Sequence, residues 1–179
     1  MTRMPPLNAP DPRPGRDAVI AIVAFGANLG DRRESIERAA ERIARLPLVD
    51  EVRLSSLHET VAVRPDGPDP DAPTYVNAVA LVITRLAPQV LLGMLHAIED
   101  EHGRERHERW GDRTLDLDLI VYGDLVSNDA RLQVPHPRAA ERLFVLEPWA
   151  EVDPDAVLPG AGRIDDLIVR LRSDDTTPR

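Results

Sequence analysis

The sequence predicts an α/β (α+β) fold with a ferredoxin-like βαββαβ core, extended by additional C-terminal strands and helices into three layers. Three observations lead to this prediction: four apolar or alternating segments of strand length, two amphipathic stretches with helical spacing, and their order along the chain. A chain of 179 residues that is 42% hydrophobic can bury one sizeable core. We therefore expect a single domain over residues 18–172.

The first strand and helix of the core have clear boundaries in the sequence. Ala18 to Phe25 is a continuous apolar run rich in valine and isoleucine, and a glycine-containing turn follows it, as is typical of a buried central strand. Asp31 followed by Glu34 has the spacing of a capping box at a helix start. Apolar residues then recur at helical spacing from Ile36 to Leu46, which predicts an amphipathic helix.

The next two strands flank an irregular stretch. Val49 to His58 is expected as the second strand and Val76 to Arg85 as the third, with Asn77, Val79, Leu81 and Ile83 on one face. Val61 to Pro73 holds four prolines among aspartates, so it is either a functional loop or a tolerated surface insertion.

The second helix and the fourth strand complete the core. Pro88 suits the first turn of a helix and Gly103 its end. The apolar stripe of this helix is expected to contain Val90, Leu91, Met94, Leu95 and Ile98. Leu115 to Tyr122 alternates as a strand does. Beyond it we expect a short strand pair around Leu125 and Leu132, a Pro-His-Pro turn, and a terminal helix near Arg163 to Arg172.

Composition excludes several classes of protein. The first 17 residues hold five prolines and no apolar run, which predicts a loose tail, and residues 173–179 are expected to form a second tail. The chain has no cysteine, and all 22 basic residues are arginine, so disulfides, thiolate chemistry and a P-loop or Schiff-base lysine are excluded. The net charge of -9 argues against nucleic acid and anionic membranes as partners. We expect a cytoplasmic monomer.

A pair of carboxylates in the fourth strand is the main candidate for chemistry. Asp116 and Asp118 alternate with leucines, so both carboxylates project from one face, roughly 6 to 7 Å apart. At that distance two such charges repel by roughly 2 kcal/mol, which a divalent cation would reverse. Oxygen ligands alone favour magnesium over zinc. The alternative, an exposed and solvated pair, stays open on this pattern alone.

A cluster of arginines precedes the carboxylate pair. Arg104, Arg106, Arg109 and Arg113 surround Trp110 in an otherwise acidic chain. Guanidinium groups pair bidentately with phosphate oxygens, and an indole offers an apolar plane for a flat ring, so a polyphosphate site is one interpretation. A surface run of salt bridges is the other, because acidic residues are interspersed.

The segment from Arg109 to Asp118, RWGDRTLDLD, resembles the signature of the 6-hydroxymethyl-7,8-dihydropterin pyrophosphokinases. The resemblance extends in order over roughly Val19 to Pro159. Four further blocks carry it: Phe25 to Arg32, Ser55 to Thr60, Tyr75 to Ala78, and Val134 to Arg138 with Phe144. It implies a ferredoxin-like fold and a transfer of diphosphate from ATP to the pterin, with AMP released.

The resemblance also implies roles for individual residues. Asp116 and Asp118 would hold two Mg²⁺ ions, while Arg104 and Arg113 would bind the polyphosphate during transfer. Further ATP contacts are expected from Glu99, Arg106, Trp110, Arg131, His136 and Arg142. The pterin would stack between Tyr75 and Phe144, with its edge read by Asn77 and by the backbone around Thr60 to Val63. An amide side chain offers the acceptor and donors that such an edge needs.

Some positions depart from the family pattern. Val61 and Ala62 stand where prolines are usual, His58 where a tyrosine is common, and His96 where a glutamine often contacts adenine. None removes an expected metal or phosphate ligand. Two other functions are weighed against the pyrophosphokinase: a catalytically silent ferredoxin-like module that binds a nucleotide or pterin, and a metal-dependent nucleotidyltransferase that releases pyrophosphate.

Overall fold

A computed structural model gives the structure of residues 17–61, 63–64, 67–68, 74–103 and 115–175. Its centre is an antiparallel sheet in the order β2-β6-β1-β7, with β3 paired to β6 beyond the end of β2. The strands of this sheet are β1 (Val19–Ala27), β2 (Val49–Leu54), β3 (His58–Val61), β6 (Thr74–Thr84) and β7 (Asp116–Tyr122). With α1 (Arg32–Ala44) and α2 (Pro88–Glu101) between them, this order confirms the ferredoxin-like core.

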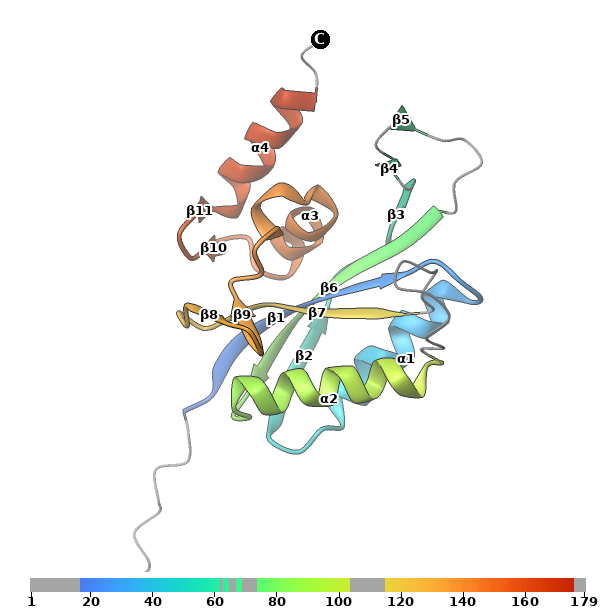
Figure 1. Cartoon of the computed structure of the whole chain (residues 1–179), viewed down its shortest axis with the longest axis vertical. Helices are drawn as coiled ribbons and strands as arrows, with labels where there is room; N and C mark the ends of the chain where they lie inside the picture. Colours follow the sequence, from blue (N-terminus) through green and yellow to red (C-terminus); the bar gives the residue numbers. More distant parts are fainter. Residues whose placement is uncertain (1–16, 62, 65–66, 69–73, 104–114, 176–179) are drawn as a thin grey trace, which may run out of the picture.

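The fold has three layers, as expected. Helices α1 and α2 lie on one face of the sheet, whereas α3 (Leu143–Val152) and α4 (Ile164–Asp175) lie on the other (Figure 1). Each face buries its own core, because alternate residues of every strand point to opposite sides. Val76, Ala78, Ala80 and Val82 of β6 belong to the core under α1 and α2. Val79, Leu81 and partly buried Ile83 pack in the core under α3 and α4, around Trp149.

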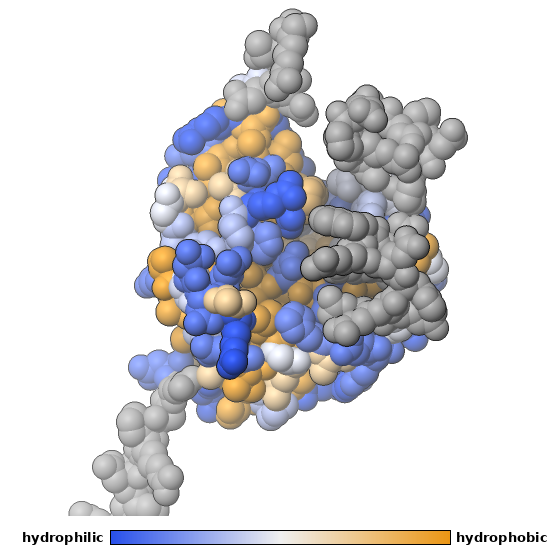
Figure 2. Space-filling model, in the orientation of Figure 1, coloured by the Kyte–Doolittle hydropathy of each residue, from blue (hydrophilic) through white to orange (hydrophobic). Residues whose placement is uncertain are grey.

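Short elements complete the structure. These are β4 (Val63–Arg64) with β5 (Gly67–Pro68), β8 (Ser127–Asp129) with β9 (Leu132–Val134), the 3₁₀ turn η1 (Ala139–Glu141), and β10 (Val157–Leu158) with β11 (Gly162–Arg163). Figure 2 shows hydrophobic surface over α4, and Val169 of that helix is 65% exposed. Across the described ranges, none of the helices has the length and apolarity that a membrane span requires.

The predicted start of α1 and both predicted ends of α2 are confirmed by their caps, whereas α1 ends at Ala44 rather than at Leu46. The Asp31 side chain accepts a hydrogen bond from the Glu34 amide at 3.0 Å, which satisfies a free N–H group of the first turn of α1. Pro88 occupies the first turn of α2, where its missing N–H costs nothing. Gly103 follows that helix with a φ of 82°, a backbone conformation that favours glycine.

The expected strand from Val49 to His58 is wrong, because the structure divides it into β2 and β3. Ser55 N still donates to the Val79 carbonyl, but the Val79 amide donates to Ser55 Oγ at 3.0 Å. Because backbone amides alternate in direction along a strand, the Ser56 amide faces away from β6, and it donates to the Glu151 carboxylate of α3 at 2.8 Å. Regular pairing with β6 is therefore broken at residues 55–57 and resumes at His58.

Three smaller expectations are corrected. Val90 is 46% exposed and does not belong to the buried stripe of α2, which contains Leu91, Leu95 and Ile98. Leu125 precedes the short strand pair, which begins at Ser127. Helix α4 ends at Asp175 rather than near Arg172.

Helix α3 had no counterpart in the sequence prediction. Pro148 lies inside it, and a proline there usually argues against a helix. Burial of Val145, Leu146 and Trp149 against the sheet holds the helix in place despite the missing hydrogen bond.

Candidate active site

The part of the sheet that α3 and α4 leave uncovered is the floor of a cleft of about 880 Å³. In the strand register Asp116 faces Gly26, Gly26 faces Asn77, and Asn77 faces His58, so these four residues form a row across β7, β1, β6 and β3. Directly paired residues point to the same side of a sheet. All four line the cleft. The floor is therefore the open continuation of the face that elsewhere packs against α3.

Asp116 and Asp118 stand on this face as the alternation predicts. Leu115, Leu117 and Leu119 are buried on the opposite face, whereas both aspartates are partly exposed and line the cleft. Because β7 is an edge strand of the sheet, the two carboxylates stand at one margin of the cleft. The prediction that the leucines bury while the aspartates share a face is confirmed.

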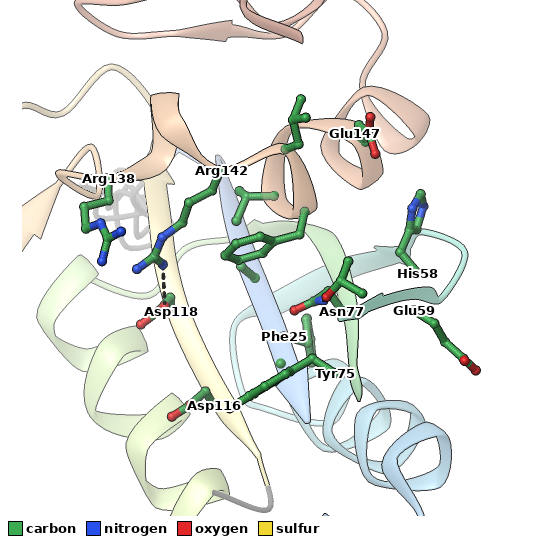
Figure 3. Close-up of a pocket in the computed structure, with 16 residues that line it drawn as sticks. Phe25, His58, Glu59, Tyr75, Asn77, Asp116, Asp118, Arg138, Arg142 and Glu147 are labelled. Carbon is green, nitrogen blue, oxygen red and sulfur yellow. Dashed lines mark hydrogen bonds and ion pairs between the residues drawn. The ribbon is translucent and has the colours of Figure 1, made fainter. Parts of the chain in front are cut away.

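Arginines approach the carboxylate pair from the segment before α3. Arg142 Nη1 lies 3.6 Å from Asp118 Oδ2, and its guanidinium carbon lies 5.6 Å from the centroid of the Phe144 ring. Figure 3 shows Arg138 and Arg142 reaching toward Asp118 from the same side. One arginine thus contacts both an aspartate and an aromatic face, an arrangement in which a cation–π contact holds the guanidinium beside the anion.

The opposite side of the cleft combines an amide with aromatic rings. Asn77, only 6% exposed, donates from Nδ2 to Thr60 Oγ1 at 2.7 Å, so its side chain is held in one orientation. Tyr75 extends from β6 toward Asp116 (Figure 3). Phe144, on α3, is 39% exposed and lines the same cleft. A flat polar ring would find apolar faces and a fixed amide here.

A β-bulge positions His136 near Asp118. In the β1–β7 pairing Val23 faces Leu119 and Ile22 faces Val121, so Ile120 is the extra residue, and its carbonyl accepts the His136 amide at 2.8 Å. Burial lowers the pKa of His136 below its usual 6.5; the Asp118 carboxylate opposes this, and two nearby guanidinium groups add to it. His136 is therefore mainly neutral at pH 7.

Glu99 lies behind the carboxylate pair rather than in the cleft. It is 4% exposed, and its Oε1 accepts a 2.8 Å hydrogen bond from the amide of Leu117, the residue between the two aspartates. Because β7 is an edge strand, this amide faces outward from the sheet, where α2 supplies the acceptor. Glu99 thus fixes the backbone from which Asp116 and Asp118 project.

The donor set at Asp116 and Asp118 fits magnesium held together with a phosphorylated substrate. Mg²⁺ usually keeps several waters and binds through one or two carboxylates plus substrate phosphates. Among the residues that the structure describes, no group of three or more acidic or histidine side chains is gathered as a metal cage. Two carboxylates at an accessible margin are therefore the arrangement expected for a metal that arrives with a nucleotide.

The structure brings together part of the predicted site. The predicted residues that line the cleft are Thr60, Tyr75, Asn77, Asp116, Asp118, Arg142 and Phe144. Glu99, Arg131 and His136 are described but do not line it. Val63 is placed in β4, and nothing is described of its side chain. Arg104, Arg106, Trp110 and Arg113 lie outside the described residues.

Three charged residues of the cleft were not predicted as site residues. Glu59 and Arg138 belong to sequence blocks that carry the family resemblance, but the resemblance assigned neither of them a role. Glu147 lies on α3, one turn after Phe144, and is paired with Arg172 of α4 at 2.7 Å. Helical spacing from Phe144 could have found it, had α3 been predicted.

Comparison with known proteins agrees with this geometry. The family model described as 7,8-dihydro-6-hydroxymethylpterin-pyrophosphokinase (HPPK) matches residues 22–154. The chain is 44% identical over 146 residues to 2-amino-4-hydroxy-6-hydroxymethyldihydropteridine pyrophosphokinase of Pseudomonas aeruginosa, covering 82% of this chain and 88% of that protein. It is 41% identical over 150 residues to the Haemophilus influenzae protein of the same name, covering 84% and 91%.

Solved structures show the same fold at lower identity. Plasmodium falciparum HPPK-DHPS, wild type, superposes with a TM-score of 0.65 at 13% identity over 88% of this chain. The form with pterin and p-hydroxybenzoate superposes with a TM-score of 0.64 at 14% identity, again over 88% of this chain. In both cases the chain spans 42% of the solved protein. From the family match and these relatives, the chain belongs to the 7,8-dihydro-6-hydroxymethylpterin-pyrophosphokinase family.

Proposed function

We propose that this chain transfers diphosphate from ATP to 6-hydroxymethyl-7,8-dihydropterin, giving AMP and the pterin diphosphate, a step in folate biosynthesis. The observation that carries this proposal is the row across the cleft floor, in which Asp116 stands at one end and Asn77 toward the other. A phosphate-binding margin and a ring-binding margin thus share one floor. That is the arrangement needed to join a nucleotide to a flat acceptor.

Asp116 and Asp118 are the proposed ligands of two Mg²⁺ ions. When bound, the ions would supply positive charge that neutralises the phosphate oxygens of the nucleotide. The support from the structure is the shared face of the two carboxylates and their exposure to the cleft. Arg142, within 3.6 Å of Asp118, would bind phosphate oxygens beside them.

Further phosphate and nucleotide contacts stay predictions from the resemblance. Arg104 and Arg113 would hold the polyphosphate during transfer, and Arg106 and Trp110 would lie against the nucleotide. His136 and Arg131 lie on the β9 side of β7, where His136 is close enough to Asp118 for the carboxylate to influence its pKa. A neutral imidazole N–H in this position would donate to a phosphate oxygen.

The pterin would lie between Tyr75 and Phe144, with its amide-like edge at Asn77. The bond to Thr60 fixes which amide atoms Asn77 presents, since Nδ2 already donates one hydrogen to Oγ1. This leaves Oδ1 and the second hydrogen for the ring. Orienting the ring in this way also orients its hydroxymethyl group toward the carboxylate margin.

In the proposed reaction the hydroxymethyl oxygen forms a bond to the β-phosphorus. The bond between that phosphorus and the oxygen bridging to the α-phosphate breaks, AMP departs with the bridging oxygen, and the hydroxyl proton passes to solvent. The chain contributes by positioning both substrates and by stabilising phosphate charge with arginines. These two effects account for most of the rate acceleration in enzymatic phosphoryl transfer.

The decisive experiment measures AMP release from ATP by the purified chain. We expect release only when Mg²⁺ and the dihydropterin are both present. Ligand binding without AMP would instead establish the silent binding module, and pyrophosphate as the product would establish a nucleotidyltransferase. Chromatography of the products separates these outcomes.

We also propose a cytoplasmic monomer. The support for a monomer is that residues of a single chain provide both margins of the cleft. Sedimentation equilibrium tests it, and a stable dimer at micromolar concentration would contradict it.

A further inference from the structure

A dense group of hydrogen bonds lies beside the cleft, formed by Glu151 of α3 with Ser56 and His58. The Ser56 amide donates to Glu151 Oε2 at 2.8 Å, and Ser56 Oγ lies 2.8 Å from Oε2 and 2.9 Å from Oε1. His58 Nε2 lies 2.6 Å from Oε1. Because a carboxylate accepts, the imidazole donates from Nε2. The group joins α3 to the segment between β2 and β3.

The hydrogen bonds of this group keep the Glu151 carboxylate ionised. Burial raises its pKa, but hydrogen bonds from the Ser56 amide, the Ser56 hydroxyl and His58 outweigh that effect, so the pKa lies below its usual 4.5. The side chain is therefore ionised at neutral pH. Hydrogen bonds to an ionised acceptor are roughly twice as strong as neutral ones.

The elements that this group of hydrogen bonds joins, α3 and β3, both contribute residues to the cleft. On α3, Glu151 lies seven residues after Phe144, so two turns place them on one side of the helix. On the sheet, His58 faces Asn77 and Thr60 faces Tyr75 across β3 and β6. Figure 3 shows the His58 side chain directed toward α3 and away from Asp118. Glu151 thus connects the helix that carries Phe144 to β3, whose partner strand β6 carries Asn77 and Tyr75.

The contact lies where the pairing with β6 is interrupted. The Val79 amide donates to Ser55 Oγ at 3.0 Å, and regular pairing resumes only at His58. The Ser56 amide faces away from β6, and Glu151 is its acceptor. Because Glu151 also contacts His58, it ties both the interruption and the first residue of β3 to α3. The contact therefore sets how far β3 stands from α3.

We propose that Glu151 is a positioning residue for the pterin side of the cleft, holding β3 and α3 at the separation that a flat ring needs between Phe144 and the Asn77 margin. The proposal rests on the proposed function, because it assumes that the pterin occupies this side. It concerns ring affinity and not the phosphate margin at Asp116 and Asp118.

The test compares Glu151→Ala and Glu151→Gln with the matched control Glu101→Ala. Glu101 also joins two elements through a carboxylate, to Arg42 of α1 at 2.8 Å, but on the opposite face of the sheet. Calorimetry measures binding of 6-hydroxymethyl-7,8-dihydropterin and, separately, of a non-hydrolysable ATP analogue with Mg²⁺. For Glu151→Ala we expect a pterin Kd at least about tenfold higher, or about 1.4 kcal/mol, with the ATP analogue within about twofold.

The conservative variant and the control make the test more specific. Glu151→Gln keeps an oxygen for the Ser56 amide and should recover part of the pterin affinity. Glu101→Ala should change the affinity for neither ligand. Hydrogen exchange gives a readout without ligand, since the Ser56 amide should lose protection in Glu151→Ala. If that variant fails to fold, Glu151→Gln and Ser56→Ala carry the test, and each should weaken pterin binding more than ATP binding.

Outcomes that overturn the proposal are distinct from failure of the proposed function. Equal losses for both ligands, or unchanged pterin affinity with an exposed Ser56 amide, would overturn the positioning role. A wild-type chain that binds both ligands but releases no AMP would overturn the catalysis while leaving the Glu151 comparison valid. A wild-type chain that binds no pterin would overturn both.

Discussion

Glu99 Oε1 accepts a 2.8 Å hydrogen bond from the Leu117 amide, so a buried carboxylate of α2 holds the backbone between the two aspartates of the cleft. The contact joins a helix of one layer to the edge strand of the sheet. It explains how β7, the last strand at this side of the described sheet, presents two side chains in a fixed orientation.

Replacing Glu99 should therefore destabilise the fold. Glu99→Ala leaves the Leu117 amide without this acceptor, and a buried donor left unsatisfied costs about 1–3 kcal/mol. Glu99→Gln retains an oxygen and should lose less. Urea denaturation measures both variants. Equal stability of Glu99→Ala and wild type would contradict the assigned contact. A separate measurement of ATP affinity in Glu99→Gln tests the predicted nucleotide contact, which a loss of affinity would support.

Asp118→Ala should abolish turnover while the chain remains folded. Asp118 is partly exposed at the margin of the cleft, so its removal creates no core cavity and relieves repulsion from Asp116. The loss of AMP formation should exceed the roughly 10- to 100-fold typical of a residue that only supports a metal ligand. Thermal unfolding provides the control: a melting temperature well below that of the wild type would count against an exposed metal ligand.

Gly26→Ala should weaken pterin binding without harming the fold. Gly26 lies between Asp116 and Asn77 on the cleft floor, and an added Cβ would meet Asn77 Oδ1 at an ordinary 3.6 Å. Alanine in a strand is favoured over glycine by roughly 0.5–1 kcal/mol, so stability should hold or rise. The methyl group would nevertheless project into the cleft between Asp116 and Asn77, where the substrate is proposed to lie. Calorimetry with the dihydropterin checks this, Gly26→Val should show a larger effect, and undiminished affinity in both would refute the floor assignment.

The lowered pKa of Glu151 predicts how the stability of the chain should change with pH. Burial raises the pKa of this group, but hydrogen bonds from Ser56 and His58 bring it below 4.5 in the folded chain. A carboxylate with a lowered folded pKa contributes stability that is present above its unfolded pKa and is lost as pH falls through the folded value. The difference in unfolding free energy between wild type and Glu151→Gln should thus be constant near neutrality and shrink below about pH 4.5.

Chemical denaturation at a series of pH values measures this difference. Ser56→Ala should reduce the pH-dependent part of the unfolding free energy that Glu151 contributes, because it removes a hydroxyl that stabilises the ionised carboxylate. A difference that grows as the pH falls would mean that Glu151 is more easily protonated when folded, contrary to the assigned hydrogen bonds.

The order of the core elements followed from the sequence because it depends on local pattern. The apolar run of β1, the Asp31 cap and the alternation around Asp116 and Asp118 each lie within a few residues of one another. The site was predictable to the same extent, and the resemblance added Tyr75, Asn77, Arg142 and Phe144, which do line the cleft. Helix α3 escaped prediction because Pro148 interrupts its local signal, although burial of Trp149 maintains it.

Which residues alternate on a strand, which side chains could carry phosphate chemistry, and which family they resemble can all be predicted from the sequence alone. Which of these residues meet depends on the packing of the layers. Glu151 accepts the Ser56 amide, which faces away from β6, and Glu99 accepts the Leu117 amide. These contacts join residues 95 and 18 positions apart. Strand and helix periods describe neighbours along the chain, whereas such pairings depend on how whole layers pack against the sheet.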